Sequence, residues 1–192
     1  MFSDKFIKKY MRLAKNFGEE ANPCYSRKIG VIIVEPKINK IVATGYNGPP
    51  RGTPHCDSKK HLENIVWPQL TENEKSLIDF KPVSQEEFVE KYSNCGICPR
   101  KLIRAESGAR LELCSCAHAE VNAIVNASQN IQGCHMFCWC PVPCIECTKI
   151  IINAGISKIY CFKENKDYSI GSRYLLKEAN IEVAEYDKNL FE

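Results

Sequence analysis

The fold is decided by residues 135–162, whose sequence is HMFCWCPVPCIECTKIIINAGISKIYCF. Residues 135–140 form a short apolar run, which is typical of a buried strand. The pattern over residues 144–153 predicts a helix, and Gly155 is placed to end it. Residues 158–162 form a second apolar run and predict another strand. Strands joined through a helix tend to run parallel, so this stretch predicts a βαβ unit.

The rest of the chain extends this unit in both directions. Ser3 is placed to cap a first helix that Gly18 ends, and its apolar face is expected to carry Phe6, Tyr10, Leu13, Ala14 and Phe17. Further strands are predicted at residues 29–34, 41–46 and 181–186, and further helices at 85–92, 118–128 and 172–179. This order predicts an α/β fold of three layers, an α-β-α sandwich with helices on both faces of one sheet.

Composition restricts the class of protein. The chain has 192 residues, of which 44% are apolar and 26% charged, values typical of one globular domain. Its longest apolar runs are too short to span a bilayer, and residues 1–5 show no signal-peptide pattern, so we expect a cytoplasmic protein without membrane contact. The net charge of +3 comes from scattered lysines and arginines. A nucleic-acid partner is therefore not expected, whereas one small anion needs only one or two of these residues.

The segment between the predicted strands and the second half of the chain is unusual. Residues 47–115 are mostly polar, and within a single deaminase-like domain, 1–192, we interpret residues 53–115 as an insertion. The chain has twelve cysteines, five of which lie in or at the exit of this segment. In a reducing compartment, clustered cysteines more often bind metal than form disulfides. The pattern predicts an insertion held by metal rather than by a strong core.

Two motifs carry the chemistry, CAHAE at residues 116–120 and PCIEC at 143–147. Cys144 and Cys147 are three apart at a helix start, so both sulfurs can face one point. The positive potential of a helix N-terminus favours the thiolate, the form that binds zinc. The imidazole of His118 makes a third ligand and leaves one tetrahedral position for water, which is typical of a catalytic zinc rather than a structural one.

Glu120 is too close to His118 in sequence for both to be easily ligands of one zinc. We expect its carboxylate to hold the attacking water and to move protons to the substrate and the leaving amine. Burial in a partly apolar pocket raises the pKa of a carboxyl group, which lets it exchange protons near neutrality. Glu120 is thus the predicted catalytic residue.

Four segments carry a family resemblance: GYNGPPRG at 45–52, HAEVNAI at 118–124, PCIEC at 143–147 and INAGI at 152–156. Through them nearly the whole chain resembles the deoxycytidylate (dCMP) deaminases of the zinc-dependent cytidine deaminase superfamily. The resemblance implies a central five-stranded mixed sheet, with the Cys-rich insertion added to it. It implies hydrolytic deamination of dCMP to dUMP with zinc-activated water, which supplies dUMP for thymidylate synthesis.

The resemblance also implies contacts and partners. Asn47 is expected to touch the sugar, and the backbone amide of Ala119 to hold the base. Many members form homo-oligomers, often hexamers, and respond to dCTP, here with Mg²⁺, as activator and to dTTP as inhibitor. The expected partners are therefore nucleotides and further copies of the chain.

The insertion is expected to hold a second, structural zinc. Some members resemble this chain in having cysteines at the positions of Cys24, Cys56, Cys98 and Cys114, which implies a closed four-cysteine site. The spacing Cys95-Gly-Ile-Cys98 favours a rival set, in which Cys95 and Cys116 join Cys98 and Cys114. Free buried thiols are the remaining alternative. Four other cysteines lie on predicted strands and are expected to be small core residues: Cys134, Cys138, Cys140 and Cys161.

The phosphate and base contacts leave alternatives open. Arg51 is our candidate for the phosphate, with Arg104 and Arg173 as further candidates, because a guanidinium matches a phosphate; each is equally an ordinary surface residue. Tyr168 is expected to pack against the base or to lie on the surface. Residues 139–142, which include Trp139, are expected beside the pocket, where they would tune substrate preference.

Two other functions remain open from the sequence. One is a deaminase of another nucleotide or of a base within a nucleic acid. The other is a zinc-stabilised binding module without catalysis. Glu120 argues against the module, because a structural zinc has no need of that carboxylate.

Overall fold

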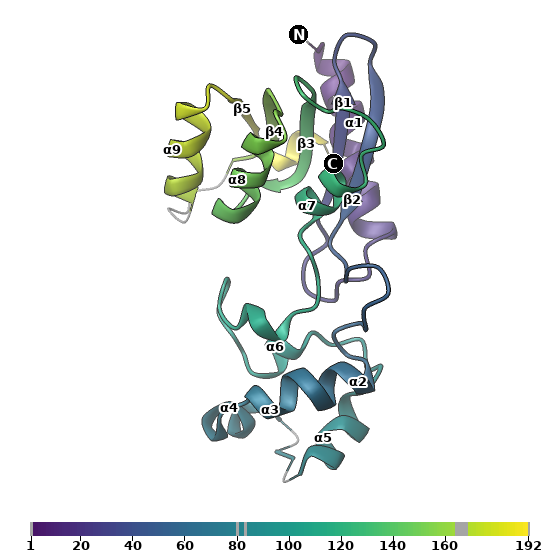
Figure 1. The fold of residues 1–192 in the computed structure, drawn as a ribbon, viewed down its shortest axis with the longest axis vertical. Helices are drawn as coiled ribbons and strands as arrows, with labels where there is room; N and C mark the ends of the chain where they lie inside the picture. Colours follow the sequence, from purple (N-terminus) through teal and green to yellow (C-terminus); the bar gives the residue numbers. More distant parts are fainter. Residues whose placement is uncertain (1, 80, 83, 164–168, 192) are drawn as a thin grey trace. The chain divides into compact units, whose positions relative to one another are not determined.

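A computed structural model describes residues 2–79, 81–82, 84–163 and 169–191 (Figure 1). The chain packs as two compact units. The first comprises Met1–Pro23, Lys28–Asn47 and His118–Glu192, and the second comprises Cys24–Arg27 and Gly48–Ala117. Among the described residues, no helix is long and apolar enough to cross a membrane.

The first unit is built on a five-stranded sheet. Its strands are β1 (Gly30–Glu35), β2 (Lys40–Tyr46), β3 (His135–Pro141), β4 (Lys158–Phe162) and β5 (Glu182–Tyr186). They lie in the order β2-β1-β3-β4-β5. The two pairings of β1 are antiparallel, whereas β3, β4 and β5 run parallel. The mixed sheet and its parallel βαβ unit are therefore confirmed.

One face of the sheet is covered by α1 (Asp4–Glu20) and by the short 3₁₀ turn η4 (Lys188–Phe191). Ser3 stands at the N-cap position, but its side chain makes no capping hydrogen bond within the described residues, and the helix continues past Gly18 to Glu20. The buried face of the helix is also rotated from the one we expected. Ile7 and Met11 are buried there, while Phe6, Leu13 and Phe17 are half-buried. The reason is the aromatic layer below, in which Phe137 stacks on Tyr160 with ring centroids 4.3 Å apart.

The opposite face is covered by α7 (Ala119–Val125), α8 (Ile145–Asn153) and α9 (Ile170–Glu178). The helix predicted at 118–128 is shorter than expected at both ends, because His118 is its N-cap and Asn126 its C-cap. The helix predicted at 172–179 begins two residues earlier, at Ile170. With α1 on the other face, the first unit has the three α-β-α layers predicted (Figure 1).

The second unit consists of short helices: α2 (Lys59–His61), the π-helical turn η1 (Leu62–Val66), α3 (Trp67–Gln69), α4 (Glu72–Leu77), α5 (Gln85–Tyr92), α6 (Pro99–Leu102) and the 3₁₀ turn η2 (Leu111–Leu113). Contrary to our expectation for this segment, it has a hydrophobic core of its own, in which Leu62, Phe88 and Leu113 are fully buried. The apolar residues are spread over several short helices, so they form no long periodic run in the sequence. The second unit is therefore stabilised by a hydrophobic core of its own, in addition to any contribution from its cysteines.

Gly45 sets the distance between the sheet and α7. A Cβ atom at this position would lie 2.3 Å from the carbonyl oxygen of Ala119 and 2.3 Å from the backbone nitrogen of Ala123. Only glycine permits so close a contact, because any side chain would collide with the helix backbone. The start of α7 is thereby pressed onto β2, which brings the residues at the end of β2 near those that begin the helix.

Candidate metal centre

The two thiols of the second motif are held at the start of α8. Cys144 is the N-cap residue of the helix and Cys147 lies in its first turn. Thr148, which is fully buried, donates its hydroxyl to the carbonyl of Pro143 at 3.2 Å and so ties the incoming loop to the helix. Both sulfurs therefore project from one turn, as their spacing predicts.

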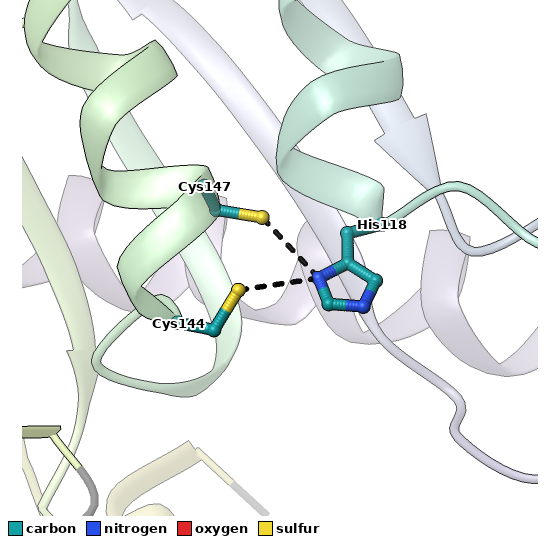
Figure 2. A group of neighbouring side chains, drawn as sticks. All are labelled: His118, Cys144 and Cys147. Carbon is teal, nitrogen blue, oxygen red and sulfur yellow. Dashed lines mark hydrogen bonds between the residues drawn. The ribbon is translucent and has the colours of Figure 1, made fainter. Parts of the chain in front are cut away.

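His118 supplies a nitrogen from the start of α7, where it is the N-cap residue. Its Nδ1 lies 3.3 Å from the Cys147 sulfur and 3.4 Å from the Cys144 sulfur (Figure 2). Figure 2 shows both thiols pointing at the imidazole from one helix while the histidine faces them from another. Within the described part of the chain, this is the one group of three or more potential ligands whose atoms all lie within 4.8 Å of each other.

These separations fit a tetrahedral zinc ion. Bond lengths of about 2.3 Å to sulfur and about 2.0 Å to nitrogen place two such ligands about 3.5 Å apart at a tetrahedral angle. The two observed distances are slightly shorter, which is what the mutual hydrogen bonds of sulfur and imidazole give. Two thiols and one imidazole are a donor set that zinc prefers, and three protein ligands leave the fourth position open.

The local charges favour the metal-binding form of one thiol. The hydrogen bond from Cys147 lowers the pKa of Cys144 to about 4, and the neighbouring His118 contributes to the same shift. Donating that hydrogen bond raises the pKa of Cys147. The pair thus holds one thiolate ready at neutral pH, and a bound cation removes the second proton.

Glu120 lies beside this group. Its side chain is buried, with 4% of its surface exposed, and it hydrogen-bonds with Cys147. Burial is the main cause that raises the pKa of its carboxyl group above the ordinary value. A carboxyl group beside a metal centre, with a raised pKa, can hold or release a proton near neutrality.

Asn47 is the first residue after β2 and is buried. Among the described residues its Oδ1 atom has no hydrogen-bond partner. A buried carbonyl oxygen without a donor is unfavourable, so this atom is suited to accept a hydrogen bond from a ligand. Ala119, which is fully buried, opens α7, where the first backbone N–H groups have no partner within the helix.

Comparison with known proteins identifies the group to which this geometry belongs. Residues 4–163 match the model of the cytidine and deoxycytidylate deaminase zinc-binding region. The chain belongs to this deaminase family. The zinc-binding region that the family model describes is the one that contains the His118, Cys144 and Cys147 group.

Among curated proteins, the chain is 30% identical over 168 residues to the deoxycytidylate deaminase of Enterobacteria phage T2, covering 85% of this chain and 84% of that one. It is 27% identical over 179 residues to the deoxycytidylate deaminase of Schizosaccharomyces pombe, covering 92% of this chain but 42% of that one. The chain therefore spans less than half of the yeast relative and most of the phage relative.

Solved structures agree on the fold. The dCMP deaminase of cyanophage S-TIM5, solved in complex with dCMP and dUMP, has a TM-score of 0.59 at 22% identity and covers 97% of this chain and 100% of its own. A diaminohydroxyphosphoribosylaminopyrimidine deaminase/reductase of Thermotoga maritima has a TM-score of 0.51 at 16% identity, over 94% of this chain and 36% of its own. The deaminase fold of the first unit is thus shared beyond close relatives.

Four other residues were predicted to contact the phosphate or the base: Arg51, Arg104, Arg173 and Tyr168. Arg51 is exposed in the second unit, and Tyr168 lies outside the described residues. Arg173 is held by Glu185 through two bonds of 2.6 and 2.7 Å, so its charge is already neutralised. Arg104 pairs with Asp79 at 3.1 Å. Neither pairing favours a role in binding phosphate.

Trp139 does not lie beside the metal centre, contrary to our expectation. It packs in the aromatic cluster under α1, edge-on to Phe162 at 4.5 Å between ring centroids. Its neighbours Cys138 and Cys140 face α7 and α8 instead, because successive side chains of a strand point to opposite faces. Cys134, just before β3, and Cys161, in β4, are buried in the same cluster, so all four cysteines are core residues as predicted, although Cys134 lies outside the strand.

The second unit gathers its own cysteines. The Cys116 thiol lies close enough to Cys114, Cys24 and Cys56 to interact with them, and Cys114 has the largest effect on its pKa. Cys98 interacts electrostatically with Cys56 and Cys114. The hydrogen bond from Cys116 lowers the pKa of Cys114 to about 6, whereas the pKa of Cys116 is raised. Cys95 is half-buried and packs against the hydrophobic core of this unit.

Sequence reasoning missed two residues of this deaminase site. Thr148 follows the second motif directly, and Asn122 lies two residues after the first. The Asn122 side chain donates to the carbonyl of Tyr46 at 2.8 Å. The signal available was the type of residue: a polar side chain in the first turns of a helix that is otherwise apolar on its buried side.

Proposed function

We propose that this chain hydrolyses the exocyclic amine of dCMP and releases dUMP and ammonia. The observation that carries the proposal is the buried Glu120 carboxyl group, which lies against the His118, Cys144 and Cys147 ligand set. A structural metal site would gain nothing from a buried carboxyl group with a raised pKa. The relatives named deoxycytidylate deaminase support dCMP as the substrate.

The roles of the residues follow from their chemistry. His118, Cys144 and Cys147 hold the zinc ion, which supplies an activated water at neutral pH when it is bound. Glu120 takes one proton from the water and passes it to ring atom N3, and it then moves the remaining proton, from the new hydroxyl on C4, to the departing amine. Its buried position keeps the proton exchange away from bulk solvent. The overall reaction is balanced, because one water and one dCMP give one dUMP and one ammonia.

Substrate binding uses backbone and carboxamide groups. The Oδ1 atom of Asn47 accepts a hydrogen bond from the sugar, since it is buried and has no other partner among the described residues. The backbone N–H of Ala119 donates to the base. In dCMP the 3′ hydroxyl is the free hydroxyl of the sugar, so it is the group that donates this hydrogen bond to Asn47. Arg51 is our candidate for the phosphate and Tyr168 for a contact with the base.

A second zinc is proposed for the second unit, as a structural ion that helps to order it. Our ligand set is Cys24, Cys56, Cys98 and Cys114, with Cys116 and Cys95 as alternates. The interactions of Cys116 with Cys114, Cys24 and Cys56 favour it over Cys95 as an alternate ligand. Zinc-to-protein ratios of single serine variants decide this: a true ligand variant loses one zinc of two, whereas C95S is expected to keep both.

The remaining proposals concern the whole protein. We propose that residues 1–192 act as one deaminase domain with its insertion at 53–115, that the protein is a cytoplasmic homo-oligomer, and that dCTP with Mg²⁺ and dTTP act as effectors. The support is family membership. Sedimentation with and without each effector tests the assembly.

The decisive experiment measures ammonia release from dCMP, CMP, deoxycytidine, dCTP, dAMP and single-stranded DNA. The wild-type chain is expected to turn over dCMP fastest. The variant Glu120→Gln, which keeps the shape but not the charge, is expected to lose at least about a thousandfold in kcat while keeping its zinc. Turnover of another substrate would move the assignment within the deaminases. Activity that survives in Glu120→Gln would overturn the mechanism, and silence across the panel with zinc bound would point to a binding module.

A further inference from the structure

The peptide group between Tyr46 and Asn47 is held by side chain and backbone together. Asn122 Nδ2 donates to the Tyr46 carbonyl oxygen at 2.8 Å, across 76 residues of sequence. The backbone N–H of Asn47 donates to the Ile29 carbonyl at 3.4 Å, a long and therefore weak bond. The bond from Asn122 is thus the shorter of the two that fix this peptide plane.

The position of this peptide group decides where Asn47 points. Tyr46 ends β2, so Asn47 begins the chain that leaves the sheet. Rotation of the preceding peptide plane would swing the Asn47 side chain, because it changes the direction of the backbone at that residue. The buried Oδ1 of Asn47 therefore depends on the Tyr46 carbonyl being held in place.

Asn122 also ties this point to the proton-transferring residue. It lies on α7, two residues after Glu120. Gly45 lets α7 approach β2 with no side chain between them, so the short Asn122 side chain can reach the strand. One bond thus couples the helix that carries Glu120 to the strand that ends at Asn47.

We infer that Asn122 is a positioning residue: it holds the Tyr46 carbonyl so that Asn47 presents its Oδ1 to the sugar hydroxyl of the nucleotide. The inference rests on the proposed function, in which Asn47 receives that hydroxyl. In this role the Asn122 side chain acts through the Tyr46 carbonyl, whereas its backbone N–H makes the ordinary helical bond to the His118 carbonyl at 3.0 Å. Its contribution appears in how well the site distinguishes a nucleotide with the hydroxyl from one without it.

The chain contains a matched control one helical turn further on. Asn126 Nδ2 donates to the Thr44 carbonyl at 3.5 Å, so it is the same residue type, bonded from the C-cap of the same helix to the same strand. Thr44 precedes Tyr46 by two residues and lies further from Asn47 in the chain. Asn126 is also exposed, and its bond is long. A loss seen for both residues would indicate only that α7 must be fastened to β2.

The test compares Asn122→Asp, Asn122→Ala and Asn126→Ala. The aspartate keeps the shape of asparagine but has no N–H to donate. Calorimetry measures binding of dUMP and of 2′,3′-dideoxyuridine monophosphate, and kinetics measure KM and kcat for dCMP. Zinc content and thermal unfolding show whether each variant is folded and loaded.

Both Asn122 variants are expected to bind dUMP about tenfold more weakly, the effect of one lost hydrogen bond, and to bind the dideoxy nucleotide almost unchanged. KM for dCMP should rise with less change in kcat, and Asn126→Ala should stay within about twofold of the wild type. In an Asn47→Ala background, Asn122→Ala should add less than about twofold, because the two residues act on one contact.

Three results would overturn the inference: Asn122 variants that keep the full preference for the 3′ hydroxyl, equal losses for both nucleotides, or additive losses in the double variant. A wild-type chain that binds both nucleotides equally would do the same. A wild-type chain that binds dUMP with the expected preference but does not deaminate dCMP would sink the proposed function alone, and the binding measurements would still decide the role of Asn122.

Discussion

The hydroxyl of Thr148 donates to the carbonyl of Pro143 across the turn that carries both thiols of the metal centre. Thr148 is fully buried, so this bond has no competition from solvent. It fixes the loop just before Cys144, and with it the direction from which the first sulfur approaches the ion. A group that orients a ligand without touching the metal commonly changes affinity as much as a weak ligand does.

The first prediction concerns this hydroxyl. Thr148→Val keeps the volume and removes the donor, and we expect it to weaken zinc binding by about tenfold or more. Competition with a chromophoric chelator measures the affinity. Thr148→Ser keeps a hydroxyl group and should retain most of the zinc affinity. If the valine variant held zinc as tightly as the wild type, the loop before Cys144 would be rigid without this bond.

The second prediction separates ligands from neighbouring core thiols. Cys144→Ala and Cys147→Ala should each lose the zinc of the first unit, because two remaining ligands hold it poorly. Cys138→Ala, also buried and on the same face of the sheet, should keep the metal and lose only about 1 kcal/mol of stability from packing. Metal analysis of purified protein checks all three. Zinc loss in the Cys138 variant would show that the core thiols take part in binding.

The third prediction uses two glycines. Gly45→Ala places a methyl group 2.3 Å from backbone atoms of Ala119 and Ala123, so we expect a loss of roughly 3 kcal/mol or more, or failure to fold. Gly171 in α9 has only a side-chain atom of Ile145 at 3.4 Å, and alanine there should be neutral or stabilising by up to about 1 kcal/mol. Urea unfolding of both variants provides the measurement. Equal stability of the two would contradict the close packing of α7 on β2.

The fourth prediction is a pH dependence of stability. The paired guanidinium of Arg173 lowers the pKa of Glu185, so the charged carboxylate stabilises the fold. This contribution is present above the pKa of an unfolded glutamate, about 4.3, and is lost as the pH falls through the lower folded value. Glu185→Gln should therefore be less stable than the wild type at pH 7 by about 1 kcal/mol, with the gap closing toward pH 3. Thermal melts across that range test it, and a gap independent of pH would exclude the charge as its cause.

The elements of the first unit could be predicted because their patterns are local. The 158–162 strand of the first unit agrees with the structure to the residue, as does the 85–92 helix of the second unit, since each is a short run with clear breaks on both sides. The buried face of α1 could not be predicted. It depends on an aromatic layer assembled from Phe137 and Tyr160, which are far from the helix in sequence.

The site divides in the same way. The spacing of Cys144 and Cys147 determines their convergence within one turn, so the sequence was sufficient for the ligands. The role of Asn122 and the orientation of Trp139 could not be predicted from the sequence, and the reason is the same for both. The role of Asn122 depends on which carbonyl group of β2 lies next to α7. The orientation of Trp139 depends on the register of β3 against the neighbouring strand. Both are set by register between strands and helices, which spacing along the chain does not reveal.

The division of the ligands between two helix starts has a consequence for how the protein matures. His118 precedes the two thiols by 26 and 29 residues, and β3 runs between them. During synthesis the histidine leaves the ribosome first, and alone it cannot retain an ion. The full set of three ligands is therefore present only after β3 has emerged and α8 has begun.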